Sequence, residues 1–143
     1  MINITNLTTN QEVKAFFEKI KRIGEIILKE EKNEGEVSVV LIGEGRMRKL
    51  NKKYRGKNRV TDVLSFGGIE MEKEKELGEI VICLREVSKN AKRLKSSMEK
   101  ELATVFIHGL LHLLGYDHEL SNQQSQEMIN KQNYYLEKWQ NLI

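Results

Sequence analysis

Residues 104–115, "TVFIHGLLHLLG", carry no polar side chain after Thr104 except two histidines. A helix that is apolar on every side belongs in the interior of a fold. His108 and His112 are four residues apart, so a helix places their side chains on one face, one turn apart. Burying two imidazoles without partners costs about 1–3 kcal/mol each. The stretch therefore predicts a central buried helix whose histidines bind something.

A third histidine lies just beyond this helix. Gly115 is placed to end the helix, because glycine readily adopts the left-handed conformation that follows a last turn. The chain can then turn back and bring His118 toward the first two histidines. Three imidazoles with an open fourth position are typical of a catalytic zinc site, whereas structural zinc sites usually have four protein ligands. Since Cys83 is the only cysteine, we predict one catalytic Zn²⁺ per chain, bound by His108, His112 and His118.

Other interpretations of the three histidines exist. They could be core residues bonded to backbone carbonyls, but all three histidines of the chain fall within residues 108–118, which favours a metal. Imidazole ligands also suit nickel, copper and iron. The spacing matches the H-E-x-x-H-x-x-G-x-x-H pattern of zinc peptidases, but Gly109 stands where their glutamate base is needed. The metal site is similar to theirs, and the chemistry should differ.

Composition favours one soluble domain over residues 1–143. The chain is 39% hydrophobic and 31% charged, as is typical of globular proteins. No apolar stretch approaches the ~20 residues of a membrane span, and the N-terminus lacks the pattern of a secretory signal. A single cysteine excludes an internal disulfide and favours a reducing, cytoplasmic compartment. We expect Cys83 to be a small buried hydrophobic residue.

Strands and helices alternate irregularly along the chain. Alternating and β-branched patterns predict strands at residues 2–7, 36–42, 61–66 and 77–84, the third of them short or at an edge. Helical spacing predicts helices at 11–31, 43–55, 85–114 and 121–143. In the second helix, Met47, Leu50 and Tyr54 are the expected inward positions. Without a strict βαβ order, the sequence predicts an α+β fold in which a small mixed sheet packs with helices around the central buried helix.

The positive charge is concentrated in one segment. Residues 44–59 contain eight basic residues and one acidic residue, a net charge of +7, whereas the whole chain has +3. Such a run is either a solvated helix face or a binding surface for a polyanion such as nucleic acid. Composition by itself leaves both interpretations open.

Three blocks of sequence together resemble the YbeY endoribonuclease family, metal-dependent RNases of bacterial ribosome maturation. "HGLLHLLGYDH" at residues 108–118 looks like the signature of this family, with Gly109 in place of the peptidase glutamate. "LNKKYRGKNRVTDVLSF" at residues 50–66 is similar to its L-N-x-x-Y-R-x-x-x-x-x-T-D-V-L-S-F stretch. "LGEIVI" at residues 77–82 resembles its L-G-D-I-x-I strand. The resemblance covers most of the chain.

The resemblance assigns roles to particular residues. It implies that His108, His112 and His118 bind the zinc and that Arg55 is the catalytic residue that handles RNA phosphate. Asp117 is expected either to orient a histidine ring from behind the metal ligands or to stabilise the local turn. The basic residues expected to hold the RNA backbone are Arg46, Arg48, Lys49, Lys52, Lys53, Lys57 and Arg59.

The function that the resemblance implies is single-strand-specific endoribonuclease activity in rRNA processing. It would include 3′ maturation of small-subunit rRNA and ribosome quality control, with RNA and the small ribosomal subunit as cytoplasmic partners. A second hypothesis is a zinc-stabilised ribosome-assembly factor that binds RNA without cutting it. A third is a peptidase related to the zinc enzymes above, which Gly109 disfavours.

Overall fold

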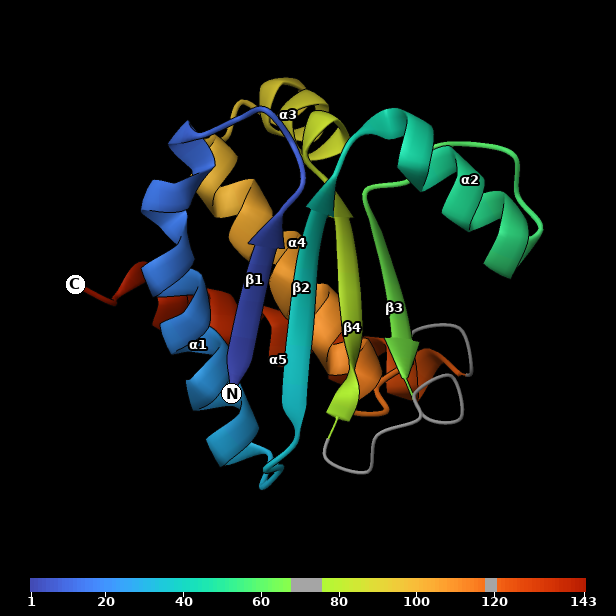
Figure 1. Cartoon of the computed structure of the whole chain (residues 1–143). Helices are drawn as coiled ribbons and strands as arrows, with labels where there is room; N and C mark the ends of the chain where they lie inside the picture. The colour runs from blue at the N-terminus through green and yellow to red at the C-terminus, as the bar shows by residue number, and fades with distance from the viewer. Residues whose placement is uncertain (68–75, 118–120) are drawn as a thin grey trace.

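Four strands form one mixed sheet in the order β1-β2-β4-β3. The computed structural model describes residues 1–67, 76–117 and 121–143 (Figure 1). β1 (Ile2–Asn6), β2 (Glu36–Ile42) and β4 (Glu76–Cys83) are parallel, and β3 (Val63–Gly67) pairs antiparallel with β4 at the edge of the sheet. The α+β fold with a small mixed sheet is confirmed, and so is the edge position of the short third strand.

The helices pack around this sheet. A 3₁₀ turn, η1 (Glu12–Phe16), leads into α1 (Phe17–Glu30), which connects the parallel strands β1 and β2. The others are α2 (Glu44–Arg55), α3 (Leu84–Arg93), α4 (Met98–Leu113) and α5 (Asn122–Gln140). In Figure 1, α1, α4 and α5 lie on one side of the sheet, while α2 lies near β3 at its upper end.

Alternation along the strands divides the interior into two clusters. On β2, Val37, Val39 and Leu41 belong to the main core, together with residues of α1 and α4. Ile42, which follows Leu41, and Cys83 of β4 belong to a smaller cluster that includes Met47 of α2, and the intervening Val40 packs against this cluster. Successive side chains of a strand point to opposite faces, so the sheet separates these clusters. Cys83 is fully buried, as predicted, and burial raises the pKa of its thiol.

The central helix is α4, as the sequence predicted. Its apolar residues fill the main core; the buried ones include Leu102, Phe106, Ile107, Leu110 and Leu111. The helix ends as expected: Gly115 has a φ of 98°, and the N–H of Tyr116 donates to the carbonyl of Leu111 at 3.0 Å. This bond, together with that from the N–H of Gly115 to the carbonyl of His112 at 3.0 Å, satisfies carbonyls that the last turn leaves without partners.

The single helix predicted over residues 85–114 is wrong. Two helices, α3 and α4, replace it, because Lys95 has a φ of 53°, which no helix accommodates. The side chain of Ser97 then caps α4 by accepting a hydrogen bond from the N–H of Lys100 at 3.0 Å. Serine at this position satisfies one of the free N–H groups of a helix start.

One predicted inward position is also wrong. Tyr54 is 48% exposed, because Met47 and Asn51 fill the space where α2 meets the sheet. Its ring lies instead edge-on to Phe66, with centroids 5.3 Å apart. In α5, Ile129 is 48% exposed, while Met128, Tyr135 and Trp139 are buried. The sequence also predicts an acidic loop, "EMEKEKE" at residues 70–76, after the third strand, and residues 70–75 lie outside the described residues.

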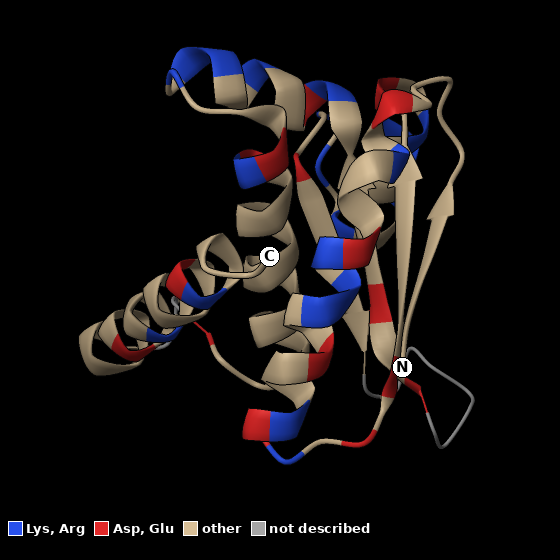
Figure 2. Cartoon of the chain, turned by 90° about the vertical axis from the view of Figure 1, so that its left-hand side faces the viewer, with Lys and Arg blue, Asp and Glu red and all other residues tan. Residues whose placement is uncertain are grey.

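The surface over α1 is of mixed charge. Figure 2, seen from the α1 side, shows Lys and Arg interspersed with Asp and Glu along this helix. Lys19 forms an ion pair with Glu99 at 3.8 Å, and such exposed pairs contribute little to stability. None of the described helices is both long and apolar enough to cross a membrane.

Candidate functional site

A cleft of about 930 Å³ lies between α4, β3 and the end of α2. It brings together three predicted basic residues, Arg55, Lys57 and Arg59, with His108, His112 and Asp117. Its other lining residues are Asn51, Thr61, Asp62, Val63, Leu64, Ser65, Gly67, Glu101, Thr104, Val105, Leu113 and Gln132. The three basic residues are 49 or more residues away in sequence from the two histidines and Asp117, so only the fold places them in one cavity.

The two helical histidines point toward one another. Their Nε2 atoms are 3.1 Å apart, and their rings are nearly perpendicular at a centroid distance of 4.6 Å. On its other side, the ring of His108 contacts Gln132 of α5, with 2.8 Å between Nδ1 and Oε1. Since an amide oxygen only accepts, Nδ1 carries the proton, and Nε2 of His108 presents its lone pair toward His112.

This arrangement fits a shared zinc ion. Two imidazole nitrogens bound tetrahedrally at 2.0–2.1 Å lie roughly 3.3 Å apart, close to the 3.1 Å between the Nε2 atoms. The hydrogen bond from His108 to Gln132 is of the kind that orients metal-binding histidines. His118, the third predicted ligand, lies outside the described residues. Within the described part of the chain, no three His, Cys, Asp or Glu residues are grouped as metal ligands, so the complete set of three stays a prediction.

Gly109 has a packing role that the sequence did not reveal. It faces the sheet: a Cβ there would lie 2.9 Å from Cγ2 of Ile80 and 3.2 Å from Oγ of Ser65. The Ser65 hydroxyl donates to the carbonyl of Gly109 at 3.0 Å. The absence of a side chain thus lets α4 approach the strands closely. A glutamate at this position would collide with the sheet.

Arg55 is held at the exposed side of the cleft. Its Nη2 donates to the carbonyl of Ser65 at 2.8 Å, and its guanidinium lies 4.8 Å from the ring centroid of Phe66. Cation–π contact and hydrogen bonding restrict the orientation of this flexible side chain. Ser65 therefore connects two parts of the site, because its carbonyl accepts from Arg55 while its hydroxyl donates to α4.

The remaining predicted residues fall into two groups. Asp117 is partly buried, lines the cleft and follows the turn at Gly115. Arg46, Arg48, Lys49, Lys52 and Lys53 are exposed on α2 and do not line the cleft. Lys57 and Arg59 are exposed and do line it. The basic segment thus forms a surface that leads to the histidines, with only its C-terminal part inside the cleft.

Several cleft residues were not found from the sequence, and three of them make contacts or have a pKa that bears on the site. Gln132 is 24 residues from its partner His108, and nothing in its local spacing indicates that contact. Ser65 lies in a block that supports the family resemblance, but a block match gives no contact. Glu101 is only 8% exposed; burial and the nearby charge of Asp62 raise the pKa of its carboxyl.

Comparison with known proteins places this cleft in a family. The model of the family described as "Endoribonuclease YbeY" matches residues 3–140. The chain belongs to the endoribonuclease YbeY family. The match includes both the basic segment and the described histidines, so the residues that form the cleft lie within the shared domain.

Individual YbeY relatives agree with this assignment. The chain is 43% identical over 121 residues to the endoribonuclease YbeY of Thermotoga maritima, which covers 85% of this chain and 79% of the relative. It is 36% identical over 137 residues to that of Petrotoga mobilis, covering 94% and 92%. A solution structure of a Thermotoga maritima protein matches with a TM-score of 0.67 and 38% identity, covering 97% of this chain and 89% of that one. The fold is thus one found in a solved structure.

Proposed function

We propose that the protein is a single-strand-specific endoribonuclease that uses one Zn²⁺ ion bound by His108, His112 and His118. The observation that carries this proposal is the pair of Nε2 atoms 3.1 Å apart in a cleft that also contains exposed basic residues. Membership of a family of endoribonucleases supports RNA as the substrate class.

The histidines supply a neutral donor set. Three neutral imidazoles would leave a bound Zn²⁺ its full double charge, and such an ion would polarise a phosphoryl oxygen and lower the pKa of nearby water. Gln132 assists by keeping the His108 proton on Nδ1, 2.8 Å from its amide oxygen. The ring therefore presents its Nε2 lone pair in the orientation that a metal needs.

Arg55 handles the phosphate of the bound RNA. Its guanidinium is a cation that presents donors in a planar fork, and this fork matches the geometry of phosphate oxygens. The contacts to Ser65 and Phe66 hold this fork beside β3. A pre-oriented cation favours the extra negative charge that develops on phosphate oxygens in the transition state.

The basic surface holds the strand. Lys57 and Arg59 continue the charge of the cleft, and Arg46, Arg48, Lys49, Lys52 and Lys53 extend it along α2. Contacts of this kind bind the phosphate backbone without reading sequence. A single RNA strand, whose bases are unpaired, can enter a cleft of about 930 Å³. The size of the cleft therefore favours single-stranded RNA over a duplex.

We assign the protein to ribosome maturation in the cytoplasm. The substrate would be the 3′ end of small-subunit rRNA, and the small ribosomal subunit would be the partner, with a further role in ribosome quality control. The resemblance of three sequence blocks to the family supports this role.

The decisive experiment compares the parent with His112→Ala. We expect the parent to contain one zinc per chain and to cut a single-stranded RNA but not the matching duplex. His112→Ala should lose zinc, because two ligands hold it far less tightly than three, and should lose cleavage with it. Elemental analysis and fragment gels measure both. Equal, chelator-sensitive cleavage by parent and variant would contradict the proposal.

The same assay tests the alternative of an RNA-binding assembly factor. Such a factor would bind RNA with a steep dependence on salt and release no fragments. No described feature favours it over cleavage. A peptidase is disfavoured further by the structure, since residue 109 faces the sheet rather than the cleft.

A further inference from the structure

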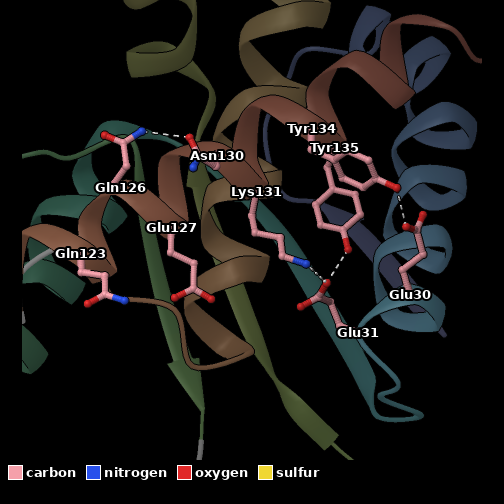
Figure 3. Close-up of a pocket in the computed structure, with 9 residues that line it drawn as sticks. All are labelled: Glu30, Glu31, Gln123, Gln126, Glu127, Asn130, Lys131, Tyr134 and Tyr135. Carbon is pink, nitrogen blue, oxygen red and sulfur yellow. Dashed lines mark hydrogen bonds and ion pairs between the residues drawn. The ribbon is translucent and has the colours of Figure 1, made fainter.

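The carboxylate of Glu31 connects three segments that are distant in sequence. It follows the end of α1, and its side chain is 11% exposed. Its oxygens accept hydrogen bonds from the hydroxyls of Tyr116 and Tyr135, each at 2.5 Å, and from Nζ of Lys131 at 3.0 Å. Figure 3 shows Lys131 and Tyr135 of α5 pointing at this carboxylate. One acidic group thus binds α5 and the segment after α4 to the end of α1.

Both bound segments lead directly to the histidine pair. Tyr116 is four residues after His112 and two residues before His118 in sequence. Lys131 precedes Gln132, whose amide oxygen contacts Nδ1 of His108. Glu31 therefore restrains the chain on the α5 side of the histidines and on the side of the turn that follows them.

The contacts of Glu31 are those of an ionised carboxylate. Burial by itself would raise its pKa, but the hydrogen bonds from Tyr116, Tyr135 and Lys131 outweigh burial, and the pKa lies below its ordinary value. Burial and the bond to Glu31 raise the pKa of Tyr135, so that hydroxyl stays protonated and donates. Hydrogen bonds to a charged acceptor are about twice as strong as neutral ones.

We propose that Glu31 is a positioning residue for the zinc site, which it stabilises through Tyr116 and through Lys131 and Tyr135 of α5. The inference rests on the proposed zinc ligands. With Glu31 in place, the turn after His112 and the α5 segment that holds Gln132 are fixed before the metal binds. Without Glu31, both segments must be ordered when the metal binds. The conformational entropy lost in this ordering makes the binding free energy less favourable.

The chain contains a matched control one residue away. Glu30 accepts a hydrogen bond from Tyr134 at 2.7 Å and pairs with Lys138 at 3.4 Å. The chemistry is the same, a glutamate with a tyrosine and a lysine of α5 (Figure 3). Tyr134, however, is 46% exposed, whereas Tyr135 is fully buried. Among the described residues, the partners of Glu30 are Tyr134 and Lys138, and neither Tyr116 nor Lys131 is one of them, so Glu30 joins α1 to α5 by contacts other than those that lead to the histidines.

The experiment measures zinc affinity by competition with a chromophoric chelator, together with the melting temperature of the metal-free protein. Removing an outer partner of a metal ligand typically lowers affinity roughly 10–100-fold. We expect the zinc dissociation constant of Glu31→Gln to rise by an amount in this range. That of Glu30→Gln should stay within about twofold of the parent. Tyr116→Phe should follow Glu31→Gln, and Tyr134→Phe should follow Glu30→Gln.

Parent-like zinc affinity in Glu31→Gln, or an equal loss in Glu31→Gln and Glu30→Gln, would overturn the positioning role. If Glu31→Gln fails to fold, Tyr116→Phe compared with Tyr134→Phe decides the question by the same readout. The parent is measured first for zinc content and RNA cleavage. A parent that binds no zinc contradicts the proposed function, whereas a parent with normal zinc and an unaffected Glu31→Gln contradicts only the positioning role.

Discussion

The cleft around the histidines and the groove between α1 and α5 differ in how they treat a buried carboxylate. The groove, about 740 Å³, contains Glu31, which accepts three hydrogen bonds. The cleft contains Glu101, which is 8% exposed and accepts no hydrogen bond from any of the described residues. The two regions are adjacent on α5, since Lys131 belongs to the groove and Gln132 to the cleft.

The comparison distinguishes two kinds of buried polar group: those that join helices and strands by hydrogen bonds, and those that line a cavity and can contact a ligand. A buried carboxylate that accepts hydrogen bonds is stabilising, whereas one that accepts none is partly desolvated without that compensation, although solvent in the cleft still reaches the Glu101 oxygens. Natural folds tolerate that cost mainly at functional sites. The polar groups of the groove therefore stabilise the packing of α1 against α5, whereas those of the cleft are arranged to contact a ligand.

The largest effect should come from breaking the close packing behind the cleft. Gly109→Glu would force a charged side chain against Ile80 and Ser65, and we expect a loss of about 3 kcal/mol or more in the free energy of unfolding. Urea unfolding measures it. As a control, Gly45→Glu adds the same side chain where a Cβ meets nothing within 4 Å, and its change should stay within about 1 kcal/mol. A stable Gly109→Glu protein that cleaves peptides would revive the peptidase hypothesis.

The next largest effect tests whether the cleft is the site of RNA cleavage. Arg55→Ala should lower cleavage of single-stranded RNA roughly 10²–10³-fold, the usual loss when a fixed transition-state donor is removed. Its zinc content should stay at the parent level, because the guanidinium is held by Ser65 and Phe66 of β3 and is not one of the proposed zinc ligands. Arg85→Ala, an exposed arginine paired with Glu44, is the control and should cleave normally. Zinc content that falls together with activity would make Arg55 structural instead.

The smallest effects concern the stability of the protein as a function of pH, to which Glu31 and Glu101 should contribute with opposite signs. The pKa of Glu31 is lowered in the fold, so its stabilisation is present above its unfolded value of about 4.5 and is lost as pH falls through the folded value. Glu31→Gln should therefore cost about 1–3 kcal/mol at pH 7, with a difference that shrinks toward pH 3. Unfolding of the metal-free protein across this range measures it.

Glu101 should show the opposite sign. Its pKa is raised in the fold by burial and by Asp62, so its favourable contribution exists below about pH 4.5 and is lost as pH rises through the folded value. Glu101→Gln should be neutral or stabilising by up to about 1 kcal/mol at pH 7. A clear loss of stability in this variant would mean that Glu101 has a partner in the fold, and the contrast between the two regions would disappear.

Much of the fold could be predicted from local patterns. The apolar run of α4 indicated a central helix, and its burial confirms this. Gly115 marked the end of that helix and has the expected positive φ. The break between α3 and α4 was missed, because Lys95 is not a residue type that signals a left-handed backbone. Tyr54 was placed inward by spacing, but Met47 and Asn51 occupy the face of α2 that meets the sheet.

The sequence by itself determined the chemistry that the protein carries: two histidines on one helical face, a third beyond a glycine turn, and a basic segment upstream. These follow from spacing, which fixes the face on which a residue lies within its own element. Only the tertiary structure decided the partners. It placed Gln132 on His108, Gly109 against the sheet, Arg55 on Ser65 and Glu31 on Tyr116. Such contacts depend on how separate elements pack, and a local pattern holds no information about the surface that will cover it.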